Sequence, residues 1–264
     1  MTDILNAIVL GVVQGITEFL PISSSGHLEI AKFILGEEAI GKESLLTTIV
    51  LHFATALSTI IVFRKEVIEI IVRALTKSGE EQRAFVFKII ISMIPAALVG
   101  VLLEDWLDQH LTGNLILVCL ALLITAALLF LADRAKTSEK GVSYWDAMWI
   151  GLAQAIAITP GISRSGATIS TSVLLGIDRE KAARFSFLMV VPLIFGKMLK
   201  DLLDGDFAGD QVNLLPLSIG FFAALLSGIL ACKWMIAIVK ASKLKYFSYY
   251  CILVAGIGLF YFLS

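Results

Sequence analysis

The sequence predicts an all-α polytopic membrane protein with an inverted-topology repeat, in which each half holds a re-entrant helix pair and three transmembrane helices. Three observations predict this fold class. The chain is 58% hydrophobic and only 16% charged, whereas a soluble domain has about 45–50% apolar and ~25% charged residues. Apolar runs long enough to cross a bilayer recur along all 264 residues. The two halves also share a sequence pattern. We therefore expect a single integral membrane domain over residues 1–264.

In the first half, a short helix pair precedes the spans. Residues 3–20 form an apolar helix that ends at Pro21, and residues 27–35 form a second short helix. This pair is too short for two full spans. We interpret it as a re-entrant helix–loop–helix, whose loop backbone must be satisfied by protein or water. Full spans are then expected at 47–63, 84–103 and 115–132, with a charged connector at 64–83.

The second half restarts the same plan. Residues 144–158 are apolar, Thr159-Pro160-Gly161 interrupts them, and residues 166–175 form a second short helix. Spans are expected at 185–200, 216–239 and 247–263. A shift of 140 positions places Gly11, Gln14, Ile16, Ile22, Ser23, Ser25 and Gly26 on Gly151, Gln154, Ile156, Ile162, Ser163, Ser165 and Gly166. We interpret this as an internal repeat, with repeat 1 at about 3–132 and repeat 2 at about 144–263.

Loop charge predicts how the repeats lie in the membrane. Each half has an odd number of spans, so the second half enters from the opposite face and the two re-entrant pairs approach each other near the midplane. One set of connectors holds 14 Lys and Arg residues: 64–83, 133–146, 176–184 and 240–247. The other set (36–46, 104–114 and 201–215) holds only Lys42. By the positive-inside rule the basic set is cytoplasmic, and both termini and the opening of the first loop are extracytoplasmic.

The second loop, over 160–168, has features that suit an oxyanion. Arg164 is the only arginine inside a predicted apolar element, where its charge needs a partner. Three hydroxyl residues flank it at the start of a helix: Ser163, Ser165 and Thr168. An arginine, hydroxyl donors and a helix N-terminus together favour phosphate binding. The alternative is a buried Arg164–Glu18 ion pair that ties the two halves together, and such a pair can open to admit an anion.

The first loop supplies the candidate reactive groups. Gln14 and Glu18 are four positions apart and share one helical face. Glu18 could act as a general base, hold a divalent cation or orient His27. His27 could be a nucleophile, a general acid or a phosphate ligand. The three serines of this loop either cap the next helix or take part in the chemistry, with Ser24 as the candidate nucleophile: Ser23, Ser24 and Ser25.

Other polar groups receive less specific interpretations. His52, at the start of a span, and His110, in a loop, are interpreted as structural or interfacial. The net charge of −1 at pH 7 argues against a nucleic-acid partner, and the apolar spans make membrane lipids the expected surroundings. The sequence does not decide between a monomer and a homodimer. Because broken helices that meet at the midplane also occur in transporters, a lipid flippase or anion transporter is an alternative to an enzyme.

Two segments resemble the signature regions of a known enzyme family. QGITEFLPISSSGH, from Gln14 to His27, and PGISRSGAT, from Pro160 to Thr168, are similar to the two motifs of the bacitracin-resistance type undecaprenyl-diphosphate phosphatases. The resemblance covers essentially the whole chain. It implies hydrolysis of undecaprenyl diphosphate to undecaprenyl phosphate and inorganic phosphate. This reaction recycles the lipid carrier for cell-wall synthesis on the outer side of the bacterial cytoplasmic (inner) membrane and gives bacitracin resistance.

The resemblance also implies roles for individual residues. The expected catalytic residues are Glu18, Ser24, His27 and Arg164. The expected substrate-binding residues are Gln14, Ser23, Ser25, Ser163, Ser165 and Thr168. A divalent cation, Mg²⁺ or Ca²⁺, is the expected requirement, with Glu18 as its ligand. Position 14 is Gln where the family also allows Glu, so any carboxylate role falls on Glu18 alone. The choice between Ser24 and His27 as nucleophile stays open.

Overall fold

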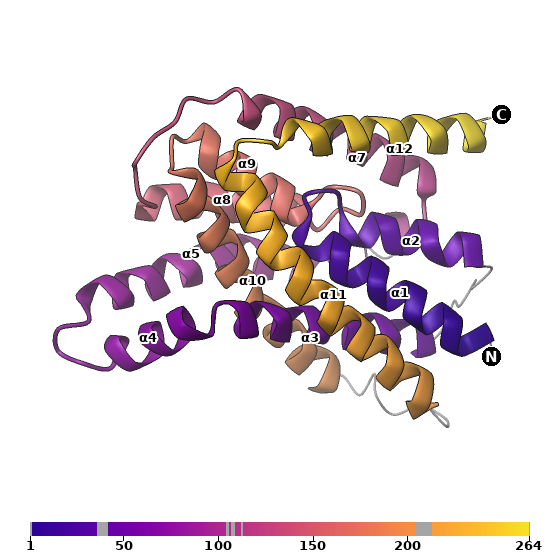
Figure 1. Cartoon of the computed structure of the whole chain (residues 1–264), viewed down its shortest axis with the longest axis horizontal. Coiled ribbons are helices and arrows are strands. Elements are labelled where there is room, and N and C mark those ends of the chain that lie inside the picture. The colour runs from indigo at the N-terminus through magenta and orange to yellow at the C-terminus, as the bar shows by residue number, and fades with distance from the viewer. Residues whose placement is uncertain are drawn as a thin grey trace.

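Helices packed side by side make up the described part of the chain (Figure 1). The computed structural model describes residues 2–35, 42–103, 113–203 and 213–263, together with 106 and 109–111. Within these ranges the helices are α1 (Thr2–Phe19), α2 (Ser24–Leu35), α3 (Lys42–Val62), α4 (Arg64–Ala74), α5 (Glu80–Leu102), α7 (Leu115–Asp133), α8 (Tyr144–Ile156), α9 (Arg164–Leu174), α10 (Arg179–Leu203), α11 (Leu214–Lys240) and α12 (Lys245–Leu263). The predicted all-α class is confirmed for this part of the chain.

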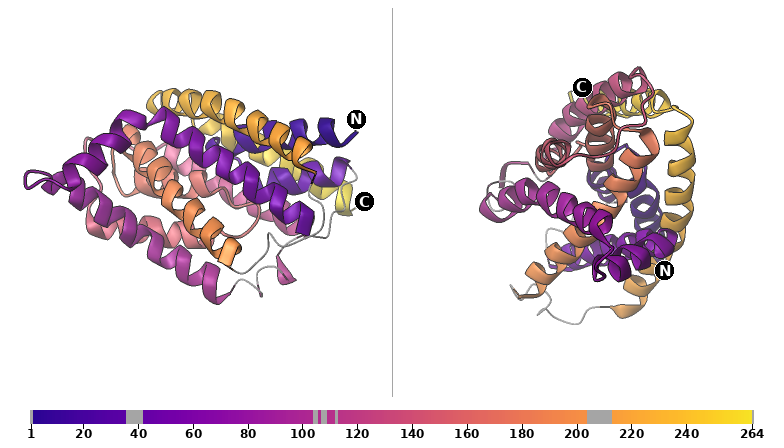
Figure 2. Two further views of the ribbon diagram at one scale, coloured as in Figure 1. Left: turned by 90° about the horizontal axis from the view of Figure 1, so that it is seen from below. Right: turned by 90° about the vertical axis from the view of Figure 1, so that its left-hand side faces the viewer.

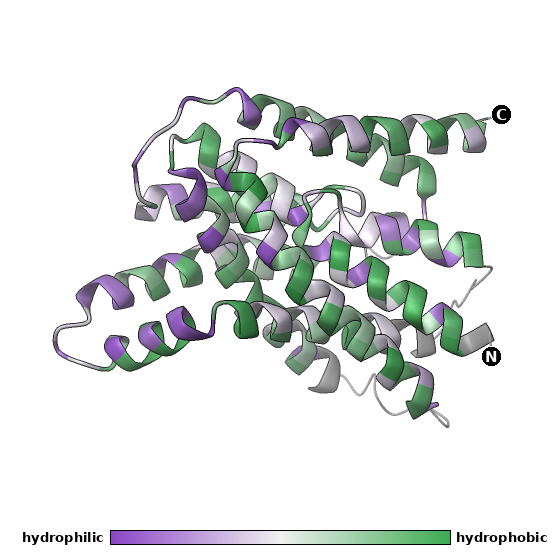
Figure 3. Ribbon diagram, viewed as in Figure 1, coloured by the Kyte–Doolittle hydropathy of each residue, from purple (hydrophilic) through white to green (hydrophobic). Residues whose placement is uncertain are grey.

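The expected membrane spans are present as long apolar helices. Among the described residues, five helices are long and apolar enough to cross a membrane by themselves: α5, α7, α10, α11 and α12. The sixth candidate is α3, which passes the same test together with α4 across a bend of 78°. These six helices coincide with the six predicted spans, and the ribbon in Figure 3 is coloured as hydrophobic over most of their length. The chain therefore has the helices of a multi-pass membrane protein.

The charged connector at 64–83, for which the sequence predicted no helix, is mostly helical. α4 covers Arg64–Ala74, and α5 already begins at Glu80, so the two form a hairpin that projects from one end of the molecule (Figure 1). α4 is amphipathic, with Ile68, Ile71 and Val72 exposed on one side. Its charged residues lower its average hydropathy, which is why a search for apolar runs alone does not find it.

Two helical segments are interrupted by a loop inside the molecule, and each forms a broken helix pair. α1 ends at Phe19 and α2 begins at Ser24, while α8 ends at Ile156 and α9 begins at Arg164. In Figure 1 the first pair enters from the end that carries both termini, and the second enters from the opposite end. The breaks lie where the sequence predicts them. The second helix of each pair starts earlier than expected, so Ser24 and Arg164 belong to the first helical turns.

Close helix crossings fix the position of both broken pairs. α1 packs against α11, where a Cβ added at Gly11 would lie 2.4 Å from the backbone oxygen of Gly220. α8 packs against α5 in the same way, because a Cβ at Gly151 would lie 2.6 Å from the backbone oxygen of Ser92. Only glycine allows a backbone to approach this closely. The two helices that lead into the loops are therefore held tightly against their neighbours.

The four basic connectors lie together at one end of the molecule, opposite the two termini (Figures 1 and 2). Lys181 Nζ donates to the Glu139 backbone oxygen at 2.7 Å, and the Lys245 backbone N–H donates to Asp133 Oδ1 at 3.1 Å. A salt bridge from Arg184 Nε to Glu66 Oε2 at 2.6 Å adds the α4 hairpin to this group. These contacts hold the four basic connectors at one end of the molecule, as the predicted topology requires.

Candidate active site

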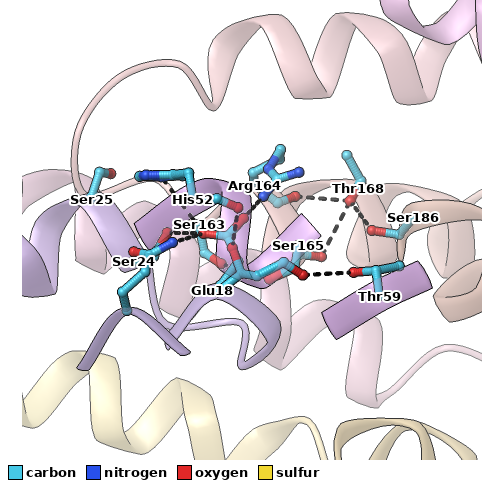
Figure 4. Close-up of polar contacts among 12 residues, drawn as sticks. Glu18, Ser24, Ser25, His52, Thr59, Ser163, Arg164, Ser165, Thr168 and Ser186 are labelled. Carbon is cyan, nitrogen blue, oxygen red and sulfur yellow. Dashed lines mark hydrogen bonds and ion pairs between the residues drawn. The ribbon is translucent and has the colours of Figure 1, made fainter. Parts of the chain in front are cut away.

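Glu18 is the centre of the polar cluster between the two broken helix pairs (Figure 4). Its side chain is only 3% exposed. One carboxylate oxygen, Oε1, forms an ion pair with Nη2 of Arg164. The other, Oε2, accepts hydrogen bonds from Gln14 Nε2 at 3.0 Å and from Ser24 Oγ at 2.7 Å. The Arg164–Glu18 pair, which was the alternative to an oxyanion site at Arg164, is present, and the candidate nucleophile Ser24 donates to the same carboxylate.

Local backbone geometry explains how Ser24 reaches Glu18. Gln14 and Glu18 are one helical turn apart on α1, so their side chains are neighbours. After α1 ends, Ser23 adopts a φ of +72°, which turns the chain back on itself. The Ser23 hydroxyl accepts a hydrogen bond from the Gly26 N–H at 3.3 Å and so caps the start of α2. This tight turn places Ser24, the first residue of α2, above the end of α1.

Arg164 is positioned by the cap of α9 and by contacts with α7. The Ser163 hydroxyl accepts a hydrogen bond from the Gly166 N–H at 3.0 Å, which makes Ser163 the N-cap of α9. The Ser163 N–H donates to Thr125 Oγ1 at 2.9 Å, and that hydroxyl donates to the Gly161 carbonyl at 3.1 Å. The loop is thus tied to α7 at two points, and the first residue of α9 is held beside α1.

The other hydroxyls of the second loop have protein partners. Ser165 Oγ donates to the Leu20 carbonyl at 3.3 Å and so joins the two loops. Thr168 Oγ1 donates to the Arg164 carbonyl at 2.8 Å and lies 2.6 Å from Ser186 Oγ on α10. A small cavity beside these groups is lined by Glu18, Phe19, Arg164, Ser165, Ser186, Phe187 and Val190. Ser165 and Thr168 therefore lie next to the ion pair, and Ser186 joins them.

Two of the predicted residues lie away from Glu18. His27 Nδ1 donates to the Ser23 carbonyl at 2.8 Å, while Nε2 lies 2.9 Å from the Tyr250 hydroxyl. The imidazole ring also stacks on the Tyr250 ring, with the ring centroids 5.6 Å apart. Both ring nitrogens are therefore directed toward α12 and the first loop's backbone. Ser25 Oγ lies 3.4 Å from Ser23 Oγ, so its hydroxyl partner is within the first loop. The structure thus brings Ser24, and not His27 or Ser25, onto Glu18.

His52 of α3 is a site residue that the sequence interpretation missed. Its Nε2 lies 3.9 Å from Glu18 Oε2, and its Nδ1 donates to the Thr48 carbonyl at 2.8 Å. That second contact fixes the ring so that Nε2 faces the carboxylate. The sequence shows a histidine close to the start of a span. Its proximity to Glu18, however, depends on how α3 packs against α1. A histidine within one span gives no indication of that packing.

The donor set around Glu18 suits a divalent cation only together with a substrate. Within the described ranges, no group of three or more His, Cys, Asp or Glu side chains could hold a metal ion. Both oxygens of Glu18 have protein partners, whereas Gln14 Oε1 is buried without one. Mg²⁺ typically takes one or two protein carboxylates and completes its shell with waters and substrate phosphates. Glu18 and Gln14 fit that pattern, because a diphosphate would supply the missing oxygens.

The arrangement can perform nucleophilic attack on an anionic phosphorus centre. A hydroxyl that donates to a carboxylate is positioned for proton removal. A guanidinium group beside the carboxylate can neutralise the negative charge on phosphoryl oxygens. Such charge neutralisation is the main requirement of phosphoryl transfer. Ser24, Glu18 and Arg164 supply these functions from two helix pairs that are far apart in the sequence.

Comparison with known proteins supports this chemistry. A family model described as "Bacitracin resistance protein BacA" matches residues 7–257. The chain is 59% identical over 252 residues to a protein of Christiangramia forsetii named undecaprenyl-diphosphatase, with 96% of each chain covered. Proteins of the same name from Parabacteroides distasonis and Methanobrevibacter smithii are 49% and 37% identical, with 95% and 96% of this chain covered and 95% of each relative.

Proposed function

This chain belongs to the bacitracin resistance protein BacA family, and we propose that it hydrolyses undecaprenyl diphosphate to undecaprenyl phosphate and inorganic phosphate. The observation that carries the proposal is the placement of Ser24 Oγ 2.7 Å from Glu18 Oε2, with Arg164 on the other carboxylate oxygen. The reaction recycles the lipid carrier for cell-wall synthesis and gives bacitracin resistance. The names of the relatives do not favour the transporter alternative.

The geometry supports Ser24 as the nucleophile. Its oxygen attacks the terminal phosphorus, its proton passes to Glu18, and the bond to the undecaprenyl phosphate oxygen breaks. Glu18 passes that proton to the departing undecaprenyl phosphate and is ionised again. Water then attacks the phosphoserine with Glu18 as base, and the proton taken from water is delivered to the Ser24 oxygen as its bond to phosphorus breaks, which releases inorganic phosphate and restores the hydroxyl. His27 is less well placed for attack, because its ring nitrogens contact the Ser23 carbonyl and Tyr250. We assign His27 the role of holding the turn that positions Ser24.

Arg164 is the proposed diphosphate ligand. The cavity beside Glu18 and Arg164 is small, so the two side chains must separate when the diphosphate enters between them. Once released, the guanidinium can bind phosphate oxygens in a bidentate manner. The first turn of α9 lies directly behind it and favours negative charge. Ser163, Ser165 and Thr168 would support this turn and bind substrate oxygens after rearrangement of their present hydrogen bonds.

A divalent cation, Mg²⁺ or Ca²⁺, is proposed as the cofactor. Glu18 and the unpartnered Gln14 Oε1 would hold it together with the diphosphate. When bound, it neutralises negative charge on the phosphate oxygens. To bind the cation, Glu18 must release one of its present hydrogen-bond or ion-pair partners. The substrate also displaces one of these partners, Arg164, from Glu18. Cation and substrate are therefore expected to bind together.

We further infer that the two halves form an inverted repeat in the membrane. The reciprocal packing of α1 on α11 and of α8 on α5 supports it, because Gly11 and Gly151 are repeat equivalents that each contact the other half. The basic end is assigned to the cytoplasm by the positive-inside rule. Both termini and the opening of the site then face the extracytoplasmic side of the bacterial cytoplasmic membrane.

The decisive test is phosphate release from undecaprenyl diphosphate by the detergent-purified protein. Wild type is compared with Arg164→Ala and with Arg134→Ala, which removes a cation from the basic end, each with and without a chelator. We expect cation-dependent release by wild type and Arg134→Ala, and a loss in Arg164→Ala. No release by well-folded wild type across several polyprenyl diphosphates and metals would overturn the proposal. Substrate flux in liposomes would then test the transporter alternative.

A further inference from the structure

A second polar cavity lies at the basic end, apart from the candidate active site. Its volume is about 420 Å³, and it is bounded by α4, the start of α5, the segment before α8 and the start of α10. Four cationic side chains line it, against the two carboxylates Glu69 and Glu81: Arg73, Lys88, Lys181 and Arg184. The proposed phosphatase reaction uses none of these residues.

The two arginines of the cavity are neutralised in part by neighbours. Arg73 pairs with Glu69 at 3.2 Å, and Arg184 pairs with Glu66 at 2.6 Å while its guanidinium lies 5.4 Å from the Phe85 ring centroid. These pairs have side chains about 39–62% exposed, so each contributes little free energy and can exchange partners at low cost. The arginines therefore remain able to bind an additional anion.

The two lysines have weaker partners than the arginines. Lys88 Nζ lies 5.4 Å from the ring centroid of Tyr144, and Lys181 Nζ donates to the Glu139 carbonyl at 2.7 Å. Among the described residues, neither ammonium group forms a salt bridge with a carboxylate. Each lysine thus brings to the cavity a positive charge that no direct salt bridge neutralises, and the lining holds four cationic side chains against two carboxylates.

The surface around the cavity is suited to lipid contact. α4 turns Glu69, Ile70 and Arg73 toward the cavity, while Ile68 and Ile71 on its outer side are 60% and 57% exposed. An amphipathic helix of this kind typically lies at the membrane interface. At the start of α8, the exposed Tyr144 and Trp145 are residue types enriched at that depth. The cavity therefore lies where lipid headgroups, and not only water, are in reach.

We propose that this cavity binds the phosphate headgroup of an anionic membrane phospholipid. Clusters of basic residues between helices at the cytoplasmic side are typical sites for such headgroups. The lysines and Arg184 would contact the phosphate, and the acyl chains would lie along the apolar outer faces of α4 and α5. Free inorganic phosphate shares the charge but gains nothing from these apolar faces, which favours the lipid. On the proposed topology, this lipid belongs to the leaflet opposite the active site.

The test is native mass spectrometry of the full chain titrated with phosphatidylglycerol and, separately, with phosphatidylcholine. The double variant Lys88→Gln/Lys181→Gln is compared with Lys77→Gln/Lys243→Gln, which loses the same charge from exposed positions at the same end. We expect wild type and the control to bind phosphatidylglycerol at least ~25-fold more tightly than phosphatidylcholine. The cavity variant should lose about fivefold in affinity for each lysine removed.

Several outcomes would overturn the lipid site. Equal losses in both double variants would indicate diffuse attraction by the basic end, and no preference in wild type would exclude a headgroup site. Displacement of phosphatidylglycerol by millimolar inorganic phosphate would assign the cavity to the free anion. Undecaprenyl diphosphate hydrolysis in neutral detergent, unchanged within about twofold, serves as the folding control. If the lysine variant does not fold, Gln82→Glu, which adds a negative charge to the lining, should weaken phosphatidylglycerol binding instead.

Discussion

Glu18 of α1 and Arg164 of α9 are 146 positions apart and form an ion pair that joins the two broken helix pairs. The carboxylate is almost fully buried, and the guanidinium is 21% exposed. A buried pair of this kind contributes little net stability while it is intact, but loss of one partner leaves an uncompensated charge. The pair therefore has two separable roles, one structural and one chemical.

Single and double substitutions should separate these roles. Glu18→Gln should lower the free energy of unfolding by about 3–5 kcal/mol and reduce phosphate release at least ~100-fold through loss of the base. Glu18→Gln/Arg164→Met should regain much of the stability, because both charges are gone, and stay inactive. Thermal unfolding and phosphate release on the same samples provide the measurement. Recovery of activity along with stability would show that the pair is only structural.

Ser24 and Ser25 are adjacent serines with different surroundings, and so form a matched pair. Ser24→Ala removes the hydroxyl that lies 2.7 Å from Glu18 and should reduce turnover by at least ~10³-fold. Ser25→Ala removes a hydroxyl whose contact is Ser23, at 3.4 Å, and should stay within about threefold of wild type. Steady-state phosphate release checks both variants. Near-wild-type turnover of Ser24→Ala would eliminate the serine-nucleophile mechanism.

His27 is expected to act through the Ser23 turn. His27→Ala removes the donor to the Ser23 carbonyl, so the turn at φ +72° loses a support and Ser24 moves away from Glu18. A displacement of about 1 Å at a reacting group costs ~100-fold in rate. Tyr250→Phe removes only the partner of Nε2 and should change turnover by less than about threefold. If Tyr250→Phe is as damaging as His27→Ala, the outer ring nitrogen takes part in the reaction.

The helix crossings can be tested with glycine substitutions. Gly151→Ala would place a methyl group 2.6 Å from the Ser92 backbone oxygen. Relief of this clash requires the backbone of α8 or α5 to move, because no flexible side chain is involved. We expect a loss of ~1–3 kcal/mol in stability from overpacking. Gly256→Ala on α12 has no atom within 4 Å of its added Cβ and should be neutral or slightly stabilising. Thermal unfolding of both variants in the same detergent is the measurement. Equal effects would argue against the close α8–α5 crossing.

The spans and the breaks could be predicted because they depend on composition along the chain. Long apolar runs define α5, α7, α11 and α12. Pro21 and Pro160 indicate from the sequence where the loops between α1 and α2 and between α8 and α9 begin. The Arg164–Glu18 contact could also be anticipated, because a buried charge needs an opposite one. α4 was missed, although Ile68, Ile71 and Val72 have helical spacing, because the apolar-run criterion does not measure periodicity.

The roles of the histidines could not be predicted from the sequence. His27 and His52 have the same local arrangement, since each Nδ1 donates to the carbonyl four positions earlier, Ser23 and Thr48 respectively. Their difference lies in what faces Nε2, which is Tyr250 of α12 in one case and Glu18 of α1 in the other. These neighbours come from helices distant in the chain, so only tertiary packing distinguishes the two rings.

The proposed orientation in the membrane can be tested by cysteine labelling in cells. The native residues Cys119, Cys232 and Cys251 are all buried, so background labelling should be low. Lys77→Cys lies in the hairpin at the basic end, and Gln109→Cys lies in the segment between α5 and α7 at the end with the termini. Because the basic end is assigned to the cytoplasm, a membrane-impermeant maleimide added to intact spheroplasts should label Gln109→Cys and not Lys77→Cys.

Permeabilisation provides the internal control for this labelling. Lys77→Cys should become reactive once the membrane is opened, which shows that the thiol is accessible and was only shielded by the bilayer. Both variants should retain phosphate release, because neither position contacts the Glu18 cluster. The reverse pattern, with Lys77→Cys labelled in intact spheroplasts, would place the basic end outside and the site opening inside. Substrate would then have to reach Glu18 and Arg164 from the cytoplasmic leaflet, which contradicts the proposed recycling on the outer face.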